Sequence, residues 1–335
     1  MQMKKKKWFV AAALLMAFVL TMTGCASTVQ EEQVEPQTVQ VAALSGPTGM
    51  GMAQMITDKD SLDLGEGVTS EYTVATQADQ VTGGIINGEY QIAAVPTNVA
   101  ATLYNKTDGA VVLGAVNTLG TLSIVTNSDE TVASIADLEG KTIYATGQGS
   151  TPEYVLEYLL RQNGLTPGEN VTVEWLAEHS EAAAKLASGE GSIAMLPQPF
   201  ATTAMAQNQD LKIAVDITQA WQDATGTQLP MGCIVVNKEW ADNNQAVVQK
   251  FMEAYQTSVE TINKADDTAA QYVVDAGIIP KAEVAKKAIP NCSITFISAQ
   301  DAQEDLKAYY DVLASFEAQA VGGKVPDDAF YSLTY

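Results

Sequence analysis

Few of the side chains that carry out chemistry in proteins occur in this sequence. It contains one histidine, His179, one arginine, Arg161, and three cysteines, Cys25, Cys233 and Cys292. This set excludes a zinc site built from several histidines and a cluster held by four cysteines. It also offers a single imidazole to the whole chain, whereas nucleophile–base catalysis usually depends on a histidine. The sequence therefore leaves little for nucleophile–base catalysis, and we expect no catalytic residues, no metal and no cofactor.

Cys25 stands where its thiol would be modified. Four consecutive lysines near the start precede an apolar run that ends at Met22. At about 15 residues the run is short for a membrane-spanning helix, which needs roughly 20, but it suits the core of a signal peptide. The ending Met-Thr-Gly-Cys resembles the bacterial lipobox, with Met22 where leucine is usual. We expect residues 1–24 to be a lipoprotein signal peptide and Cys25 to be lipidated; an uncleaved membrane anchor is the alternative. Either way, the chain would be extracytoplasmic and anchored to the cell membrane.

The other two cysteines allow two interpretations. Cys233 and Cys292 remain after Cys25 is assigned to the lipid. In an oxidising compartment two cysteines can form a disulfide. They can equally be two buried free thiols, and the sequence leaves both possibilities open.

The composition is that of a globular protein with an acidic surface. A chain of 335 residues suffices for about two domains of roughly 100–200 residues each. A hydrophobic content of 47% excludes wholesale disorder. Only 18 Lys and Arg oppose 40 Asp and Glu, which gives a formal net charge of −22. Because such a surface repels phosphate backbones, nucleic acid is excluded as a partner.

Short apolar runs alternate with helical patterns twice along the chain. The predicted strands are 39–44, 72–76, 91–95, 111–116, 122–125, 141–145, 171–176, 193–196, 211–215 and 231–236. One helix is marked clearly, because Ser150 and Glu153 have the spacing of a capping box and an apolar stripe follows them. Residues 241–319 are predicted to be mostly helical. This alternation predicts an α/β fold with parallel sheets covered by helices on both faces.

Several stretches resemble the solute-binding proteins of ABC importers. Residues 138–143 (LEGKTI) resemble the L-x-G-K-x-[IV] opening of the second lobe in that family. Residues 187–196 (ASGEGSIAML) are similar to its L-x-S-G-x-x-D-[IA]-A step, with Ser192 where aspartate is common. Three further stretches are similar to its ligand-facing turns: 45–51, 95–98 and 196–200. The resemblance is strongest to the nitrate, sulfonate, taurine and thiamine-precursor binding proteins, and it covers about residues 38–330.

The resemblance implies the type II periplasmic-binding-protein fold, in which two doubly wound lobes are joined by two hinge strands and enclose a ligand cleft. We expect a flexible tether at 25–37, lobe 1 at 38–123 plus 232–335, and lobe 2 at 124–231. The implied partners are a small-molecule solute and an ABC permease and ATPase complex. We expect the protein to be a monomer that contacts the membrane through its N-terminal lipid.

Candidate ligand-binding residues follow the predicted strands. Ligands of open parallel sheets bind beyond the carboxyl ends of the strands, where helix N-termini offer free N–H groups. The candidates there are Ser45, Thr48, Gly49, Thr97, Asn98, Ser150, Thr151, His179, Gln198, Phe200 and Trp221. The Ser, Thr and Asn side chains could instead only cap helices, and Phe200 and Trp221 could pack in the core. His179 could be an exposed residue before a helix that Ser180 caps.

No lysine or arginine falls in these loops. Lys141 and Lys212 stand at the beginnings of their predicted strands, at the edge away from the cleft, and Arg161 lies at the far end of its helix. A sulfonate or nitrate receptor commonly benefits from a charge-assisted clamp. We therefore expect a neutral or weakly anionic metabolite, for which the resemblance suggests a pyrimidine-like compound.

Two other functions compete with solute delivery. A lipid-tethered sensor would bind the same kind of ligand but signal through another protein. An enzyme related to the thiamine-pyrimidine synthases is the second alternative, since these resemble the same group of binding proteins. Those enzymes carry a cysteine-rich segment and active-site histidines, whereas this chain has no run of cysteines and a single histidine, His179.

Overall fold

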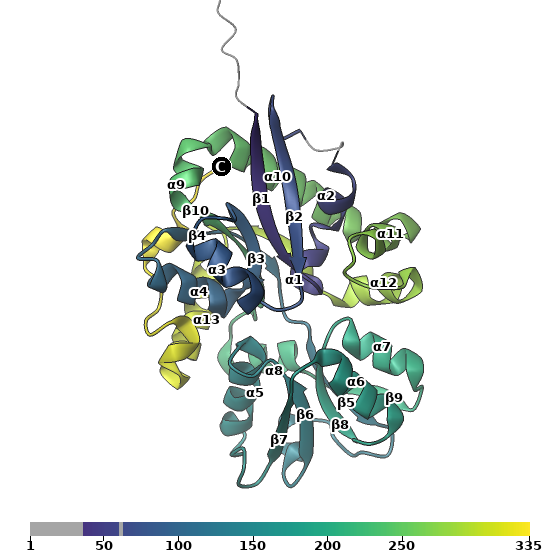
Figure 1. The fold of residues 1–335 in the computed structure, drawn as a ribbon. Coiled ribbons are helices and arrows are strands. Elements are labelled where there is room, and N and C mark those ends of the chain that lie inside the picture. The colour runs from purple at the N-terminus through teal and green to yellow at the C-terminus, as the bar shows by residue number, and fades with distance from the viewer. Residues whose placement is uncertain (1–35, 60–62) are drawn as a thin grey trace, which may run out of the picture. The chain divides into compact units, whose positions relative to one another are not determined.

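Two β-sheets organise the part of the chain that the computed structural model describes, residues 36–59 and 63–335 (Figure 1). The predicted signal peptide, Cys25 and the predicted tether up to residue 35 lie outside the described residues. We call the part built on the first sheet lobe 1 and the part built on the second sheet lobe 2.

Lobe 1 contains a mixed sheet. Its strand order is β11 (Ile294–Ser298), β4 (Val111–Thr118), β10 (Gly232–Asn237), β3 (Ile92–Pro96), β1 (Gln37–Leu44) and β2 (Val68–Ala75). The strand β1 pairs in parallel with β2 and β3, whereas β10 pairs antiparallel with β3 and β4. The edge strand β11 is also antiparallel to β4. The predicted parallel pairing is confirmed for β1 with β2 and β3 but is wrong for β10, which enters this sheet from lobe 2 and runs against its neighbours.

Lobe 2 contains the second mixed sheet. Its order is β7 (Thr172–Leu176), β6 (Thr142–Thr146), β8 (Ile193–Pro197), β5 (Leu122–Asn127) and β9 (Leu211–Asp216). The strand β6 is parallel to β7 and β8, while β5 is antiparallel to β8 and β9. Since β5 lies wholly in this sheet, the first connection between the sheets consists of residues 119–121. The second runs through residues 226–231 to β10.

Helices cover both faces of the lobe 1 sheet, because successive strand residues alternate between two apolar clusters. Ala42 and Leu44 face one cluster, and Val41 and Ala43 face the other. The first cluster contains residues of α3 (Asp79–Ile86), α4 (Thr97–Lys106) and α13 (Gln303–Phe316). The second contains residues of α1 (Pro47–Met50), α2 (Ala53–Thr57), α10 (Gln245–Ile262), α11 (Asp267–Asp275) and α12 (Ala282–Ala288). The short helix α9 (Lys238–Asn243) follows β10.

Lobe 2 is covered in the same way. The helices α5 (Thr151–Gln162) and α8 (Ile217–Thr225) pack on one face, and α6 (His179–Ser188) and α7 (Phe200–Gln207) pack on the other. The predicted helical stretch 241–319 is helical in α9 to α13, but it also contains β11, an edge strand that the sequence pattern missed.

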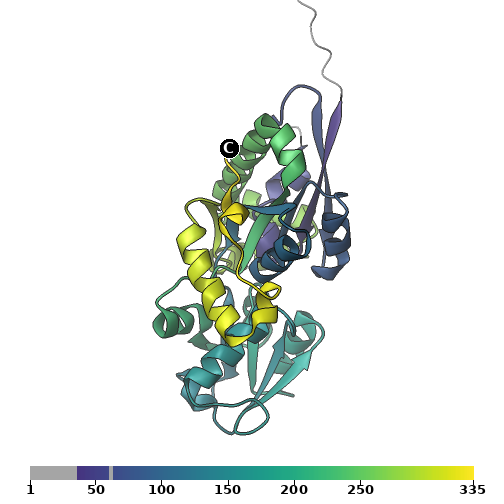
Figure 2. The same ribbon diagram turned by 90° about the vertical axis from the view of Figure 1, so that its left-hand side faces the viewer.

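One apolar cluster is continuous between the two lobes. The helix α13 carries it from lobe 1 to α5 and α8 of lobe 2, and both views show α13 beside α5 (Figures 1 and 2). The rings of Tyr158 and Phe316 lie 6.3 Å apart, and those of Trp221 and Tyr309 lie 5.6 Å apart. We call these four residues the aromatic seam. Residues 36–335 accordingly form one compact unit rather than two.

Cys233 and Cys292 are both buried free thiols, so the disulfide alternative is wrong. Cys233 belongs to the cluster on the α4 and α13 face of the lobe 1 sheet, whereas Cys292 belongs to the cluster on the opposite face. Burial raises the pKa of the Cys292 thiol to about 12, and it raises the pKa of the Cys233 thiol further.

Within the described ranges, no helix has the length and apolar character needed to cross a membrane.

Candidate functional site

A cavity of about 870 Å³ is lined by residues of both lobes. Its walls are formed where the strands of each sheet end and the next helix begins. Lobe 1 contributes the ends of β1, β2 and β3 with the starts of α1, α3 and α4, and lobe 2 contributes the ends of β6, β7 and β8 with the starts of α5, α6 and α7. Helix N-termini leave backbone N–H groups unsatisfied, so this cavity is rich in hydrogen-bond donors.

The turn after β1 places Thr48 on the lobe 1 wall. Gly46 has a φ of 106°, which side chains other than glycine rarely allow. At Gly49 a Cβ would lie 2.0 Å from the Leu44 carbonyl oxygen. Asn117 Nδ2 donates to the Thr48 carbonyl oxygen at 2.9 Å, which fixes the turn to β4. The two glycines therefore let the chain turn sharply enough to bring Thr48 to the cavity.

The side chain of Asn98 reaches the cavity from α4 in a defined orientation. It is 4% exposed. Tyr309 of α13 donates through its hydroxyl to Thr151 Oγ1 at 3.3 Å, and Thr151 in turn donates to Asn98 Oδ1 at 3.0 Å. In this arrangement the Asn98 amide oxygen faces Thr151 and not the cavity. Asn98 Nδ2 has no partner among the described residues, so the cavity receives an NH2 donor.

Gln198 presents the matching amide from lobe 2. It is 3% exposed, and its Oε1 accepts from the Thr202 hydroxyl at 2.7 Å and from the Thr202 backbone N–H at 3.3 Å. Because a backbone N–H can only donate, the oxygen must face Thr202. Gln198 Nε2 has no partner within the described part of the chain and is left for a solute.

The start of α5 differs from the predicted capping box. Ser150 is the N-cap residue, but its hydroxyl donates to the Gly147 carbonyl at 2.6 Å and caps no helix N–H. The Glu153 carboxylate accepts from the Gly149 N–H at 2.5 Å and not from Ser150. The loop 147–150 is thereby closed on itself, and α5 begins at the cavity without a side-chain cap. Pro152 has no N–H, and the Glu153 and Tyr154 N–H groups bond to the Ser150 carbonyl, so the Thr151 N–H is the donor left at this helix start.

Four aromatic rings line the cavity, and all belong to lobe 2: Tyr154, Trp175, His179 and Phe200. We call this group the aromatic wall. The rings of His179 and Phe200 are 5.1 Å apart and inclined by 41°. His179 Nδ1 is hydrogen-bonded to Thr146 Oγ1. Burial lowers the pKa of His179 more than the nearby Glu178 carboxylate raises it, so the neutral imidazole is favoured.

Most of the predicted candidates meet in this cavity. Eight of them line it: Ser45, Thr48, Asn98, Ser150, Thr151, His179, Gln198 and Phe200. Gly49, Thr97 and Trp221 do not. Thr97 turns its hydroxyl to the Pro230 carbonyl at 2.6 Å. Trp221 is fully buried in α8, where its indole N–H donates to Thr227 Oγ1 and to the Gln228 carbonyl. His179 is the first residue of α6, whose N-cap is Glu178. The alternative in which His179 precedes a helix capped by Ser180 is therefore wrong.

Sequence reasoning missed part of the lining. Tyr154 lies one turn inside α5, and Trp175 is the next-to-last residue of β7, so neither falls in a loop. Gln319 reaches the cavity from the C-terminal segment, far away in sequence. A search extended by one helical turn and by the last strand residues would have found the two rings. The contribution of Gln319 required the tertiary structure.

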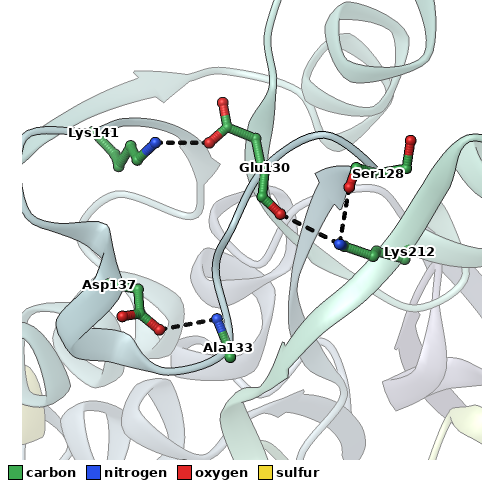
Figure 3. Close-up of polar contacts among 6 residues, drawn as sticks. All are labelled: Ser128, Glu130, Ala133, Asp137, Lys141 and Lys212. Atoms are coloured by element: carbon green, nitrogen blue, oxygen red, sulfur yellow. Dashed lines mark hydrogen bonds and ion pairs between the residues drawn. The ribbon is translucent and has the colours of Figure 1, made fainter.

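None of the described residues that line the cavity is Lys or Arg. The lysines near the sheet of lobe 2 bond to other groups, away from the cavity. Lys141 Nζ lies 2.7 Å from Glu130 Oε2. Lys212 Nζ donates to the Ser128 carbonyl at 3.1 Å and to the Glu130 carbonyl at 3.3 Å (Figure 3). Two acidic residues, Asp79 and Glu178, line the cavity instead. Among the residues that the structure describes, no group of acidic, histidine or cysteine side chains is arranged to hold a metal.

Solved structures with the same fold are numerous. An ABC transporter protein from Parabacteroides distasonis aligns with a TM-score of 0.74 and 22% identity, over 88% of this chain and 98% of that one. The periplasmic aliphatic sulphonate binding protein SsuA from Escherichia coli aligns with a TM-score of 0.72 and 14% identity, over 90% of this chain and 93% of that one. The alkanesulfonate-binding protein SsuA from Xanthomonas axonopodis pv. citri, bound to MOPS, aligns with a TM-score of 0.63 and 15% identity, over 88% and 96% of the two chains. These likenesses confirm the predicted periplasmic-binding-protein fold.

The sequence gives the family. No curated protein matches it significantly. Residues 59–278, more than half of the chain, match the family described as "ABC transporter, phosphonate, periplasmic substrate-binding protein". The predicted relation to solute-binding proteins of ABC importers is thereby confirmed, and this chain belongs to the phosphonate family of periplasmic substrate-binding proteins of ABC transporters.

Proposed function

We propose that this substrate-binding protein is a lipoprotein that captures a small, neutral or weakly anionic organic solute between its lobes and delivers it to an ABC permease and ATPase. Pyrimidine-like metabolites are the candidates that the sequence suggests. The lipid on Cys25 would hold the protein at the membrane, and the described part of the chain would work as a monomer.

The composition of the cavity lining carries this proposal. Its hydrogen-bond donors are neutral: the Asn98 and Gln198 amides, hydroxyls such as that of Thr48, and backbone N–H groups at helix N-termini. A strongly anionic solute would gain from Lys or Arg, yet the described lining contains neither and includes two carboxylates. Helix N-termini alone can hold an anion, so the two carboxylates in the lining, Asp79 and Glu178, are what favour a neutral or weakly anionic solute.

Ligand contacts on both lobes would make solute binding favour a closed arrangement. Only contacts that differ between open and closed states can drive closure. Thr48 and Asn98 stand on lobe 1, and Ser150 and Gln198 stand on lobe 2. Each of their hydrogen bonds to a solute would contribute about 0.5–1.5 kcal/mol net.

The test identifies the solute first. Purified protein is analysed by native mass spectrometry for a co-purified small molecule, which is then titrated against Thr48→Val, Asn98→Ala, Ser150→Ala and Gln198→Ala. Substitutions on both lobes should weaken binding, and small-angle scattering should show compaction with the solute. Binding that none of the four variants changes would refute the interlobe site. Cys25→Ala should release the protein from membranes, and full retention of the cleaved variant would refute the lipid anchor.

A further inference from the structure

We infer that the solute is a planar, uncharged ring that carries acceptor oxygens, stacked on the aromatic wall and hydrogen-bonded by the Asn98 and Gln198 amides. This inference rests on the proposed function and narrows it to a class of compound.

The first observation is the uneven distribution of rings. The aromatic wall comes entirely from lobe 2, from the four separate elements α5, β7, α6 and α7. The described lobe 1 residues that line the cavity are polar or aliphatic, among them Thr48, Thr76 and Val99. One side of the cavity therefore offers flat faces, and the other offers hydrogen bonds and small apolar groups. A flat solute would meet both sides, because every aromatic base or ring has a face that can stack.

The second observation is that Trp175 differs from the core tryptophan Trp221 in burial and in the hydrogen bonding of its indole N–H. Trp221 is fully buried, and its indole N–H donates to two oxygens at 3.1 and 3.2 Å. Trp175 is half-buried, lines the cavity, and has no hydrogen-bond partner among the described residues. Buried indole N–H groups usually find an acceptor. Trp175 packs partly against the apolar cluster shared by the lobes, but its ring also lines the cavity and its indole N–H is not used by the described protein.

The third observation is the fixed polarity of the two buried amides. Each has its oxygen held by protein hydroxyl groups, so each offers NH2 to the cavity. They come from different lobes, one from the start of α4 and one from the residue before Pro199 and α7. A ring that bears two exocyclic oxygens could accept from both amides at once while it stacks on lobe 2. An amine donor in the same place would face two donors and be rejected.

The fourth observation is the negative charge of the lining, which disfavours a charged ring. The described lining contains no Lys or Arg, and Asp79 and Glu178 add negative charge. The only histidine of the chain is held neutral by burial. Among planar, oxygen-bearing rings, the uncharged ones fit this environment.

The experiment compares two sets of probes by tryptophan fluorescence and thermal shift. The planar set contains uracil, thymine, hypoxanthine and nicotinamide. The second set contains 5,6-dihydrouracil, which keeps the two carbonyls of uracil but is puckered, and the anions methylphosphonate and ethanesulfonate. We expect at least one planar ring to quench tryptophan emission and raise the melting temperature. If uracil or thymine is the bound ring, dihydrouracil should bind about tenfold more weakly, since stacking is lost.

Variants assign the effect to residues. Trp175→Leu should weaken ring binding about tenfold and abolish the quenching. The control Trp240→Leu, on α9 outside the cavity, should leave binding unchanged. Gln198→Glu replaces the donor NH2 by an acceptor and should weaken binding more than tenfold, whereas Gln207→Glu, exposed on α7, should not.

The outcomes separate this inference from the proposed function. If methylphosphonate or ethanesulfonate binds and no planar ring does, the inference is wrong, although solute capture stands. Ring binding that survives Trp175→Leu also overturns it. If no probe binds and the purified protein yields no small molecule by mass spectrometry, the proposed function is wrong as well.

Discussion

Two adjacent tyrosines of α13 should separate ligand affinity from stability. Tyr309 and Tyr310 are both fully buried, and their rings lie 5.6 Å apart. The Tyr309 hydroxyl donates across the lobes to Thr151 Oγ1 at 3.3 Å, whereas the Tyr310 hydroxyl donates within lobe 1 to the Thr97 carbonyl at 2.6 Å. Replacing each by phenylalanine removes one oxygen from equivalent surroundings, so each variant is the control for the other.

The expected magnitudes differ because the partners differ. In Tyr310→Phe a short bond to a buried carbonyl is lost, which costs about 1–3 kcal/mol. For a chain of this size that lowers the melting temperature by roughly 2–6 °C. In Tyr309→Phe the lost bond is long, and the Thr151 hydroxyl can bond to the Asn98 amide in either orientation of that amide, so the stability cost is about 0.5 kcal/mol. The Thr151 hydroxyl is then no longer oriented, and the Asn98 amide can turn its oxygen to the cavity. Loss of one donor to the solute weakens binding by about twofold to tenfold.

Calorimetry with the solute identified by mass spectrometry measures the dissociation constant. Thermal melts of the free protein measure the melting temperature. We expect Tyr309→Phe to change the dissociation constant with little change in melting temperature, and Tyr310→Phe to do the reverse. Asn98→Asp in the Tyr309→Phe background should add little further loss, because the donor is already compromised. If the two tyrosine variants lose affinity equally, the orientation of Asn98 does not depend on Tyr309.

Three further outcomes are expected. Cys233 and Cys292 should react with iodoacetamide only after unfolding, since burial raises the pKa of both thiols; labelling of the native Cys25→Ala protein would contradict their burial. The pKa of His179 is lower in the folded protein than its ordinary value of about 6.5, so the unfolded chain takes up the proton first and stability falls as pH decreases below about 6.5. Melting temperatures of His179→Gln should therefore depend less on pH between 7 and 5, and unchanged pH dependence would argue against the shift. Gly232→Val should destabilise by about 1–3 kcal/mol in urea melts, because a Cβ there would lie 2.6 Å from Asn117 Oδ1, while Gly83→Ala, with open space around it in α3, should stabilise by about 0.5–1 kcal/mol.

Strand and helix patterns could be predicted because burial and periodicity are local. The start of α5 was expected at Ser150, where Pro152 and the following apolar stripe mark it. The antiparallel course of β5 and β10 could not be predicted, because a buried strand has the same pattern in either direction. The strand β11 was missed, since five residues after three helices resemble a loop or another helix turn.

The cavity could be predicted from strand ends, because the carboxyl edge of each sheet determines which loops converge. The direction in which each side chain points could not be predicted from the sequence. Trp221 follows a strand just as Phe200 does, yet α8 turns it into the aromatic seam, whereas Phe200 faces the cavity. Similarly, whether Ser150 caps a helix or closes its own loop depends on the left-handed conformation of Gly147 and Gly149, which the spacing alone does not determine.

The aromatic seam determines how this protein could be made into an optical sensor. The fully buried rings of Trp221 and Tyr309 join α8 to α13, and the half-buried rings of Tyr158 and Phe316 join α5 to it. A rearrangement there would expose a large apolar area, so a dye attached nearby would barely move. The exposed side chains of Gln77 and Glu178 also bond across the lobes, at 3.2 Å and away from the buried contacts of Thr151 with Asn98 and Tyr309. A donor and an acceptor fluorophore placed beside these two residues would report lobe motion with the largest signal. The same two fluorophores attached near the aromatic seam would serve as an internal reference, since the distance between them should stay constant.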